Sequence, residues 1–482
     1  MAVYRKEEDM RLIGRNREKD VLMQCTESKR PEFLVVYGRR RVGKTYLVRE
    51  FFGGRFSFYA TGYAEKKTDA QLKAFHESLT AYGDSHTRAP EDWFEAFRRL
   101  RELLSAQEVY REPNCQKRLV FLDELPWMDT ARSDFKGALD YFWNSWGSAQ
   151  EDLLFIVCGS ATSWIIEHLL MDTGGFYHRV TRRILLEPFS LRECEELLSF
   201  NGIAWTRAQQ TECYMVFGGI PYYLNLLDSR YSLAQNIEEL CFKSYGELKN
   251  EFDILFRSLF KKPEKHIAII RSLSKRRQGM TRKELSGEKA VGGGSVLTKN
   301  LEELEQCGFI RKYRNYVKRK NEAMFQIVDP FTLFSLSFIK KGKTDSWLGY
   351  HNTPGYYAWR GNSFEMVCLN HIPQIKDALG ISGVGTQEYA WRSRDAMHGA
   401  QIDLLIDRND GIINLCEMKY TNGEYEISRE EHHNLENRRA VFQRETNCKK
   451  AVHILLISAT DVKRGMYADI AQNMITGDML FT

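Results

Sequence analysis

The chain has 482 residues, of which 43% are hydrophobic and 28% are charged. This composition is that of an ordinary globular protein, and the length exceeds what one hydrophobic core supports, so we expect roughly three domains. No stretch approaches the ~18 apolar residues of a membrane span, and the first residues lack the apolar run of a signal peptide. We therefore expect a cytoplasmic protein without a membrane partner.

The distribution of charge and of cysteines indicates the kind of partner and the state of the thiols. The net charge is +5, but the segment from Lys261 to Lys320 holds 17 Lys and Arg against 6 Asp and Glu, a local charge of +11. Such asymmetry indicates a polyanionic partner for one module. The 10 cysteines are scattered without a Cys-x-x-Cys pair, which indicates reduced thiols rather than disulfides or zinc ligands.

A phosphate-binding loop is indicated near the start of the chain. The apolar run Phe33 to Tyr37 predicts a buried strand, and it is followed by the pattern G-x-x-x-x-G-K-[ST] and a helix start. The glycines let backbone N–H groups point at a phosphate, Lys44 would neutralise the β- and γ-phosphates, and Thr45 would hold Mg²⁺. A glycine turn without a ligand is the alternative. The loop residues expected at the nucleotide are Gly38, Arg41, Val42, Gly43, Lys44 and Thr45.

Two carboxylates follow the next strong strand. Leu119 to Leu122 are apolar and lead directly into Asp123 and Glu124. Downstream of a phosphate loop, we expect Asp123 to hold the Mg²⁺ shell and Glu124 to polarise the attacking water. An acidic turn after a strand would look the same in isolation.

A third strand, Leu153 to Cys158, ends close to Ser160. The hydroxyl of Ser160 could sense the γ-phosphate, although ordinary turn chemistry explains a serine there equally well. Three arginines in the segment after it could reach a phosphate in the same or a neighbouring subunit, or could be solvated or bind nucleic acid: Arg179, Arg182 and Arg183.

From Ser190 to about Phe260 the periodicity is helical, as in a small lid packed on a nucleotide domain. The basic segment that follows shows three helices and then two strands, the layout of a winged helix. DNA binding is favoured by its charge, and a protein contact or spacer is the alternative. The residues expected to face DNA are Ser295, Thr298, Lys299 and Asn300 on the third helix and Arg314, Lys318, Arg319 and Lys320 at the wing.

The last third of the chain has an α/β pattern with a candidate metal site. Asp403 lies on one strand, and Glu417 and Lys419 lie on the next, where alternation makes them point the same way. Together with Glu365 on a preceding helix, they could hold Mg²⁺ or Mn²⁺ for attack on a phosphodiester, with Asp403 and Glu417 as ligands and Lys419 orienting water. A solvated strand end is the alternative.

Six motifs in this order resemble the archaeal-type P-loop ATPases, relatives of the AAA+ and STAND ATPases that are also common in Bacteroidetes. They are LIGRNRE, GRRRVGKT, VFLDELPW, CGSATSW, RVTRRILLEPFSLRE and GGIPYYL. The resemblance implies ATP and Mg²⁺ as cofactors, and it implies that Ile13, Gly14 and Arg15 lie near the adenine. Family members continue into a winged helix and a restriction-endonuclease-like domain, whose PD-(D/E)XK pattern Glu365, Asp403, Glu417 and Lys419 match, except that Ile402 replaces the proline.

The expected fold class is therefore α/β: a parallel-sheet P-loop domain of the ASCE/AAA+ kind, a helical lid, a winged helix and a restriction-endonuclease-like α/β domain. The expected boundaries are 1–189, 190–258, 259–335 and 336–482. The leading functional hypothesis is an ATPase that controls a Mg²⁺- or Mn²⁺-dependent DNA endonuclease, in host defence or mobile-element biology, with DNA and a homo-oligomer as partners. The alternatives are a non-catalytic STAND-like switch bound to DNA and a loader that uses ATP turnover for work.

Overall fold

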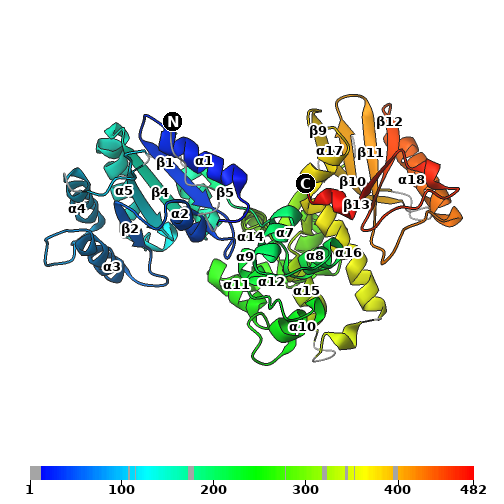
Figure 1. Cartoon of the computed structure of the whole chain (residues 1–482), viewed down its shortest axis with the longest axis horizontal. Coiled ribbons are helices and arrows are strands. Elements are labelled where there is room, and N and C mark those ends of the chain that lie inside the picture. Colours follow the sequence, from blue (N-terminus) through cyan, green and yellow to red (C-terminus); the bar gives the residue numbers. More distant parts are fainter. Residues whose placement is uncertain are drawn as a thin grey trace. The chain divides into compact units, whose positions relative to one another are not determined.

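The computed structural model describes residues 12–106, 109–113, 115–171, 178–276, 278–316, 323–341, 346–351, 353–393 and 400–482. The chain divides into two compact units, Met1–Glu187 and Pro188–Thr482. In Figure 1 the first unit is coloured from blue to blue-green and the second from green to red.

The first unit is built on a parallel sheet of five strands in the order β2-β3-β4-β1-β5. This confirms the parallel α/β sheet expected from the sequence. The strands are β1 (Glu32–Tyr37), β2 (Phe58–Thr61), β3 (Arg118–Asp123), β4 (Leu153–Gly159) and β5 (Arg182–Leu185). The helices are α1 (Asn16–Glu27), α2 (Lys44–Phe51), α3 (Thr68–Ala81), α4 (Trp93–Ser105), α5 (Phe135–Ser145) and α6 (Thr162–Ile165).

Strand order decides where the functional residues meet. β4 lies between β1 and β3, and all three run parallel. Their carboxyl ends therefore share one edge of the sheet, where open parallel sheets bind ligands. Every residue of β3 and β4 is buried, as expected for strands covered by helices on both faces.

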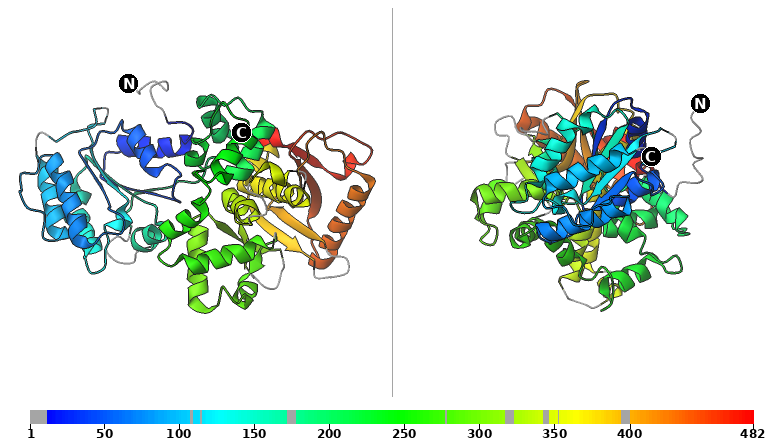
Figure 2. Two further views of the ribbon diagram at one scale, coloured as in Figure 1. Left: turned by 90° about the horizontal axis from the view of Figure 1, so that it is seen from below. Right: turned by 90° about the vertical axis from the view of Figure 1, so that its left-hand side faces the viewer.

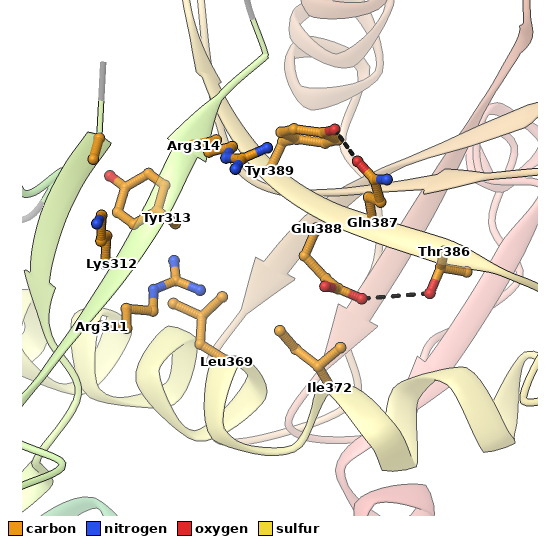
Figure 3. Close-up of a pocket in the computed structure, with 11 residues that line it drawn as sticks. Arg311, Lys312, Tyr313, Arg314, Leu369, Ile372, Thr386, Gln387, Glu388 and Tyr389 are labelled. Carbon is orange, nitrogen blue, oxygen red and sulfur yellow. Dashed lines mark hydrogen bonds between the residues drawn. The ribbon is translucent and has the colours of Figure 1, made fainter. Parts of the chain in front are cut away.

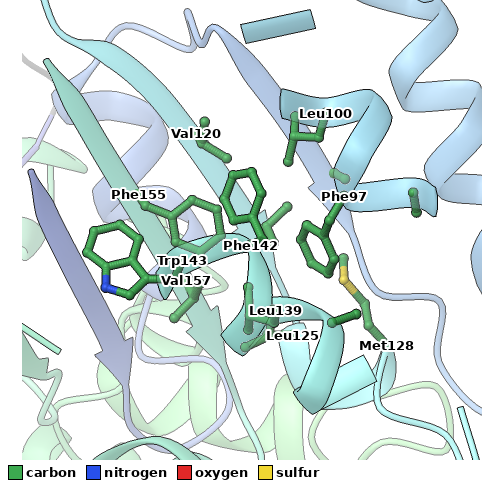
Figure 4. Packing of buried hydrophobic residues seen from close by; sticks show 14 of the residues in the cluster. Phe97, Leu100, Val120, Leu125, Met128, Leu139, Phe142, Trp143, Phe155 and Val157 are labelled. Carbon is green, nitrogen blue, oxygen red and sulfur yellow. The ribbon is translucent and has the colours of Figure 1, made fainter. Parts of the chain in front are cut away.

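Helices α3, α4 and α5 cover one face of this sheet through an aromatic core (Figure 4). Phe155 of β4 is fully buried, and its ring centroid lies 5.2 Å from that of Phe33 and 5.7 Å from that of Phe142. Trp143 packs 4.9 Å from Phe33. Offset and edge-to-face contacts of this kind add to the free energy gained from area burial, so the core fixes α5 on the sheet.

The second unit begins with helices of the region in which the sequence predicted a lid: α7 (Leu191–Phe200), α8 (Arg207–Phe217), α9 (Pro221–Leu224), α10 (Leu233–Ile237) and α11 (Glu251–Leu259). The basic segment follows with α12 (Pro263–Ser274), β6 (Met280–Thr281), α13 (Arg282–Gly287), α14 (Gly294–Gln306), β7 (Ile310–Asn315) and β8 (Ala323–Ile327). The helices of the remainder are α15 (Pro330–Phe334), α16 (Pro354–Asn370), α17 (Ile372–Ala378) and α18 (Arg429–Thr446). Its strands are β9 (Thr386–Arg392), β10 (Gln401–Arg408), β11 (Ile412–Lys419), β12 (Ala451–Ser458) and β13 (Asn473–Thr476).

One sheet of eight strands runs through this unit in the order β13-β12-β11-β10-β9-β7-β8-β6. The hairpin β7–β8 joins the C-terminal strands because β7 pairs in parallel with β9, with Arg314 opposite Tyr389 (Figure 3) and Asn315 opposite Ala390. Helix α18 packs on one face of the C-terminal strands (Figure 2). The sequence predicted a domain boundary after residue 335, and this sheet continues across it.

The segment from Phe58 to Lys117 opens with the edge strand β2 and continues into α3 and α4. The wing candidates Lys318, Arg319 and Lys320 lie outside the described residues. Within the described ranges, no helix is long and apolar enough to cross a membrane.

The aromatic core gives a stability prediction. We expect Phe155→Ala to lower the free energy of unfolding of the first unit by about 3–5 kcal/mol, because it leaves a cavity between Phe33 and Phe142. Tyr141→Ala on α5 is the matched control, since that side chain is 64% exposed. Urea unfolding followed by tryptophan fluorescence measures both. Equal effects of the two substitutions would contradict the role given to Phe155.

Candidate nucleotide-binding site

The loop between β1 and α2 has the backbone that its two glycines allow. Gly38 has φ +141° and Gly43 has φ +93°, values that side chains disfavour. A Cβ on Gly38 would lie 2.4 Å from the carbonyl oxygen of Leu186, so this glycine is also required by close packing. The predicted strand, loop and helix start therefore occur in the expected order.

Lys44 lies across this loop. It is 5% exposed, and its Nζ donates to the carbonyl oxygens of Gly38, at 3.0 Å, and Arg39, at 2.9 Å. These bonds hold the ammonium inside the curl of backbone at the N-terminus of α2. A positive charge and a helix N-terminus in one place suit the phosphates of a nucleotide.

Thr45 and Asp123 are brought together from adjacent elements. The Thr45 hydroxyl lies 3.1 and 2.9 Å from the two carboxylate oxygens of Asp123, which also accept from the Cys158 thiol, at 2.7 Å, and from the Glu124 N–H, at 2.9 Å. Burial raises the pKa of Asp123 above its usual value, although these hydrogen bonds oppose the rise. A hydroxyl and a desolvated carboxylate in contact fit Mg²⁺, which would favour the ionised carboxylate.

Glu124 lies beside the third strand end. Its φ of 47° turns the chain sharply after Asp123. Ser160 donates to the Glu124 carboxylate with its hydroxyl, at 2.6 Å, and with its backbone N–H, at 3.2 Å. The expected water-polarising residue and the expected sensor are thus in direct contact.

Arg15, which was predicted to lie near the adenine, links two segments of the first unit. It has φ 58° and is 4% exposed, and Gly14 before it has φ 62°. The guanidinium donates to the carbonyl oxygens of Val42, at 3.1 Å, and Glu187, at 2.7 Å. The side chain therefore ties the phosphate loop to the end of the first unit. Sequence reasoning placed Arg15 near the adenine and missed this link, as it missed the Cys158 thiol bonded to Asp123.

The three arginines of uncertain role are separated by the sheet. Arg182 and Arg183 are neighbours on β5, so they point to opposite faces. Burial raises the pKa of the Cys25 thiol and of the Tyr37 hydroxyl. The charge of Arg182 lowers the first pKa, and the charge of Arg183 lowers the second. Arg179 is exposed before the strand.

The C-terminal carboxylates lie near several charged side chains. Glu417 forms ion pairs with Lys419, at 3.0 Å, and with Arg438 of α18. Lys419 also pairs with Glu431 of α18, at 2.8 Å. Although burial lowers the pKa of Lys419, Glu417 and Glu431 raise it above its ordinary value, so the amine stays protonated. As predicted, Glu417 and Lys419 share a face, and that face is covered by α18.

Asp403 lies beside Glu417, because Leu404 pairs with Cys416 in the antiparallel register of β10 and β11. The pairing of β10 with β9 is irregular between Ile402 and Leu405, and Asp403 at this point lines a small cavity together with Tyr313 of β7. Helix α16 carries Glu365, which is 7% exposed, and packs against β11. Burial raises the pKa of the Cys368 thiol on α16, and the nearby Cys416 raises it further. Helix α16 lies on the face of β11 that carries Cys416. That face is opposite to the face of Glu417, because strand side chains alternate.

Within the described part of the chain, no group of three or more His, Cys, Asp or Glu side chains could hold a metal ion. The tetrad stays a predicted metal site, and in the structure the Glu417 carboxylate pairs with Lys419 and Arg438.

The fold and loop define a P-loop ATPase domain in the first part of the chain. Residues 12–227 match a family described as an ATPase domain predominantly from Archaea. The curated relative "Uncharacterized protein MJECL04" of Methanocaldococcus jannaschii is 24% identical over 266 residues, which are 54% of this chain and 54% of the relative. This chain thus spans about half the length of that relative.

The chain is also similar to two solved structures. The Walker-type ATPase PABY2304 of Pyrococcus abyssi is 20% identical, with a TM-score of 0.49, and the match covers 68% of this chain and 97% of that one. CDC6P from Pyrobaculum aerophilum is 14% identical, with a TM-score of 0.33, over 70% of this chain and 96% of that one.

The contact between Glu124 and Ser160 gives a kinetic prediction. We expect Glu124→Gln to lower kcat for ATP hydrolysis by about 100-fold or more while ATP still binds, because the amide cannot take up a proton from water. Phosphate release and equilibrium binding of a fluorescent ATP analogue separate the two effects. Glu151→Gln, in an exposed turn of the same unit, is the control. Unchanged turnover in Glu124→Gln would show that this carboxylate is not the base.

Proposed function

We propose that this chain is an ATP-hydrolysing switch whose nucleotide state controls a DNA-binding second unit. The observation that carries the proposal is the Thr45–Asp123 contact, with Lys44 and Glu124 at the same sheet edge. Lys44 binds the β- and γ-phosphates in place of its present carbonyl partners. Thr45 and Asp123 would hold Mg²⁺, which would neutralise charge on the phosphates, and Glu124 orients and deprotonates the attacking water.

The junction between the units supports a switching role. Gly38 lies directly against the backbone of Leu186, and Arg15 joins the loop carbonyl of Val42 to the carbonyl of Glu187. The second unit begins at the next residue, Pro188. A phosphate that draws Lys44 and the loop inward therefore changes the hydrogen bonds of the residues that lead into the second unit.

This gives a test of the switch. We expect saturating ATP to slow hydrogen exchange in residues 184–192 of the wild type, because the loop and Arg15 then hold that backbone more tightly. Arg15→Gln should abolish most of this difference, and Arg17→Gln, on the exposed side of α1, should keep it. Exchange that is insensitive to ATP in the wild type, or a response that survives in Arg15→Gln, would argue against this route.

DNA is the partner proposed for the second unit. The support is the local charge of the basic segment and the exposed face of α14, where Ser295, Thr298 and Lys299 face solvent. Asn300 is 8% exposed and does not join that face. We also propose a homo-oligomer in which the exposed Arg179 of one subunit reaches the nucleotide of another.

The C-terminal domain has two candidate roles, a metal-dependent nuclease controlled by ATP and a non-catalytic binding domain. The ion pairs of Glu417 with Lys419 and Arg438 favour binding. A carboxylate that accepts from two cations has little capacity left for Mg²⁺, and a lysine held protonated by two carboxylates is a poor base.

A cleavage assay distinguishes the two roles. We expect purified wild type with Mg²⁺ or Mn²⁺, with and without ATP, to cleave plasmid and linear DNA no faster than Lys419→Ala does. The matched variant is Lys463→Ala, which removes a lysine paired with Glu426 on the surface of the same unit. Cleavage that is lost in Lys419→Ala and kept in Lys463→Ala would establish the nuclease and rule out the purely binding role.

A further inference from the structure

Hydrogen-bond donors surround the Asp123 carboxylate at the carboxyl end of β3. Asp123 is 4% exposed, and the donors come from α2, β2, β4 and the next residue: the Thr45 and Tyr59 hydroxyls, the Cys158 thiol and the Glu124 N–H. A carboxylate has two oxygens with about four acceptor positions. The distribution of these donors therefore decides which oxygen can still accept a further partner.

The two oxygens of Asp123 are occupied unequally. Oδ1 accepts from the Cys158 thiol, at 2.7 Å, and from the Glu124 N–H, at 2.9 Å. The Thr45 hydroxyl is shared, at 3.1 Å from Oδ1 and 2.9 Å from Oδ2, whereas the Tyr59 hydroxyl is 3.5 Å from Oδ2, at the limit of a hydrogen bond. Among the described residues, donors of the chain therefore fill Oδ1, and Oδ2 is the oxygen that keeps an acceptor position.

Cys158 is held in place by the sheet. It lies on β4, the central strand of the five, opposite Val36 of β1, and it is fully buried. The sequence of β4 is LLFIVCG, so Cys158 is the single residue of this strand whose side chain can donate a hydrogen bond. Because a central strand cannot shift without its neighbours, the thiol is a rigidly placed donor for Oδ1 of Asp123.

A buried cysteine usually acts as a small apolar side chain that fills space. Cys158 differs from that role, because its sulfur contacts a buried carboxylate, and such a group is costly unless donors satisfy it. Loss of the thiol would leave Oδ1 with an unfilled acceptor position in a buried place. The carboxylate of Asp123 would then have no fixed assignment of one oxygen to the chain and the other to a ligand.

We propose that Cys158 is a positioning residue of the nucleotide site. Its thiol occupies Oδ1 of Asp123 and thereby keeps Oδ2 available for the Mg²⁺ that Asp123 and Thr45 would hold. The inference rests on the proposed function, because it requires the cation site of an ATPase. Outer-shell partners orient metal-binding side chains in this way, and their loss typically lowers metal affinity by about 10- to 100-fold. Cys158 acts through Asp123, so its loss weakens the cation and leaves the binding of the phosphates unchanged.

The test measures the effect of Mg²⁺ on nucleotide binding rather than on turnover. In full-length protein, fluorescence gives the affinity for the non-hydrolysable analogue mant-AMPPNP in excess Mg²⁺ and in EDTA, and the ratio of the two affinities reports the contribution of the cation. We expect Cys158→Ala to lower this ratio about 10-fold while the affinity in EDTA stays that of the wild type. Cys25→Ala, which removes a fully buried thiol from α1 of the same unit, should change neither.

The Cys158→Ser variant separates positioning from packing. Serine is smaller than cysteine, as alanine is, but it restores a donor, so we expect the ratio in Cys158→Ser to lie within about 2-fold of the wild type. If Cys158 only filled space, Cys158→Ser would be no better than Cys158→Ala. The same loss in both variants, an unchanged ratio in Cys158→Ala, or an equal loss of affinity in EDTA would overturn the proposal.

A third variant keeps the test decisive if Cys158→Ala proves unstable. Cys158→Val fills the space without a donor, and we expect it to show the same loss of about 10-fold in the ratio. A ratio near 1 in the wild type would contradict the cation site and, with it, the proposed function. A Mg²⁺ effect that is present in the wild type and kept in Cys158→Val would contradict the role of Cys158 alone.

Discussion

The buried carboxylate of Asp123 is the constraint on which the first unit depends. Its oxygens accept from Thr45, which is 78 residues away in the chain, and from Cys158, which is 35 residues away. A desolvated carboxylate is costly unless donors surround it, and here the donors come from the ends of three neighbouring elements. The same residues that reduce this cost link the ends of these elements, so the structural support of Asp123 and the predicted Mg²⁺ site use the same contacts.

The local sequence pattern was sufficient to predict the phosphate loop, because one short segment determines its geometry. Gly38 and Gly43 have the positive φ values that the loop requires, and Lys44 follows them by chain order alone. The meeting of Thr45 with Asp123 also followed, because parallel strands end at one edge. The Arg15 link and the Cys158 thiol could not be predicted, since each depends on which distant backbone or side chain packs beside it.

In the second unit, the alternation of side chains along a strand was not enough to predict the surroundings of the candidate metal site. It correctly placed Glu417 and Lys419 on one face of β11, but it could not show that α18 would bring Glu431 and Arg438 to the same face. Nor could it show the irregular pairing that leaves Asp403 beside Tyr313. A motif gives the spacing of its residues along the strand. The charged partners of those residues depend on the helix that packs on the same face, which the motif does not specify.

The continuous sheet changes how the basic segment should be understood. A winged helix that stands alone can bind DNA without disturbing its neighbours, whereas β7 here shares backbone hydrogen bonds with β9. A displacement of the hairpin must therefore displace β9 as well. If a polyanion binds the basic segment as proposed, its binding is linked to the arrangement of the C-terminal strands, and the linkage is reciprocal in free energy.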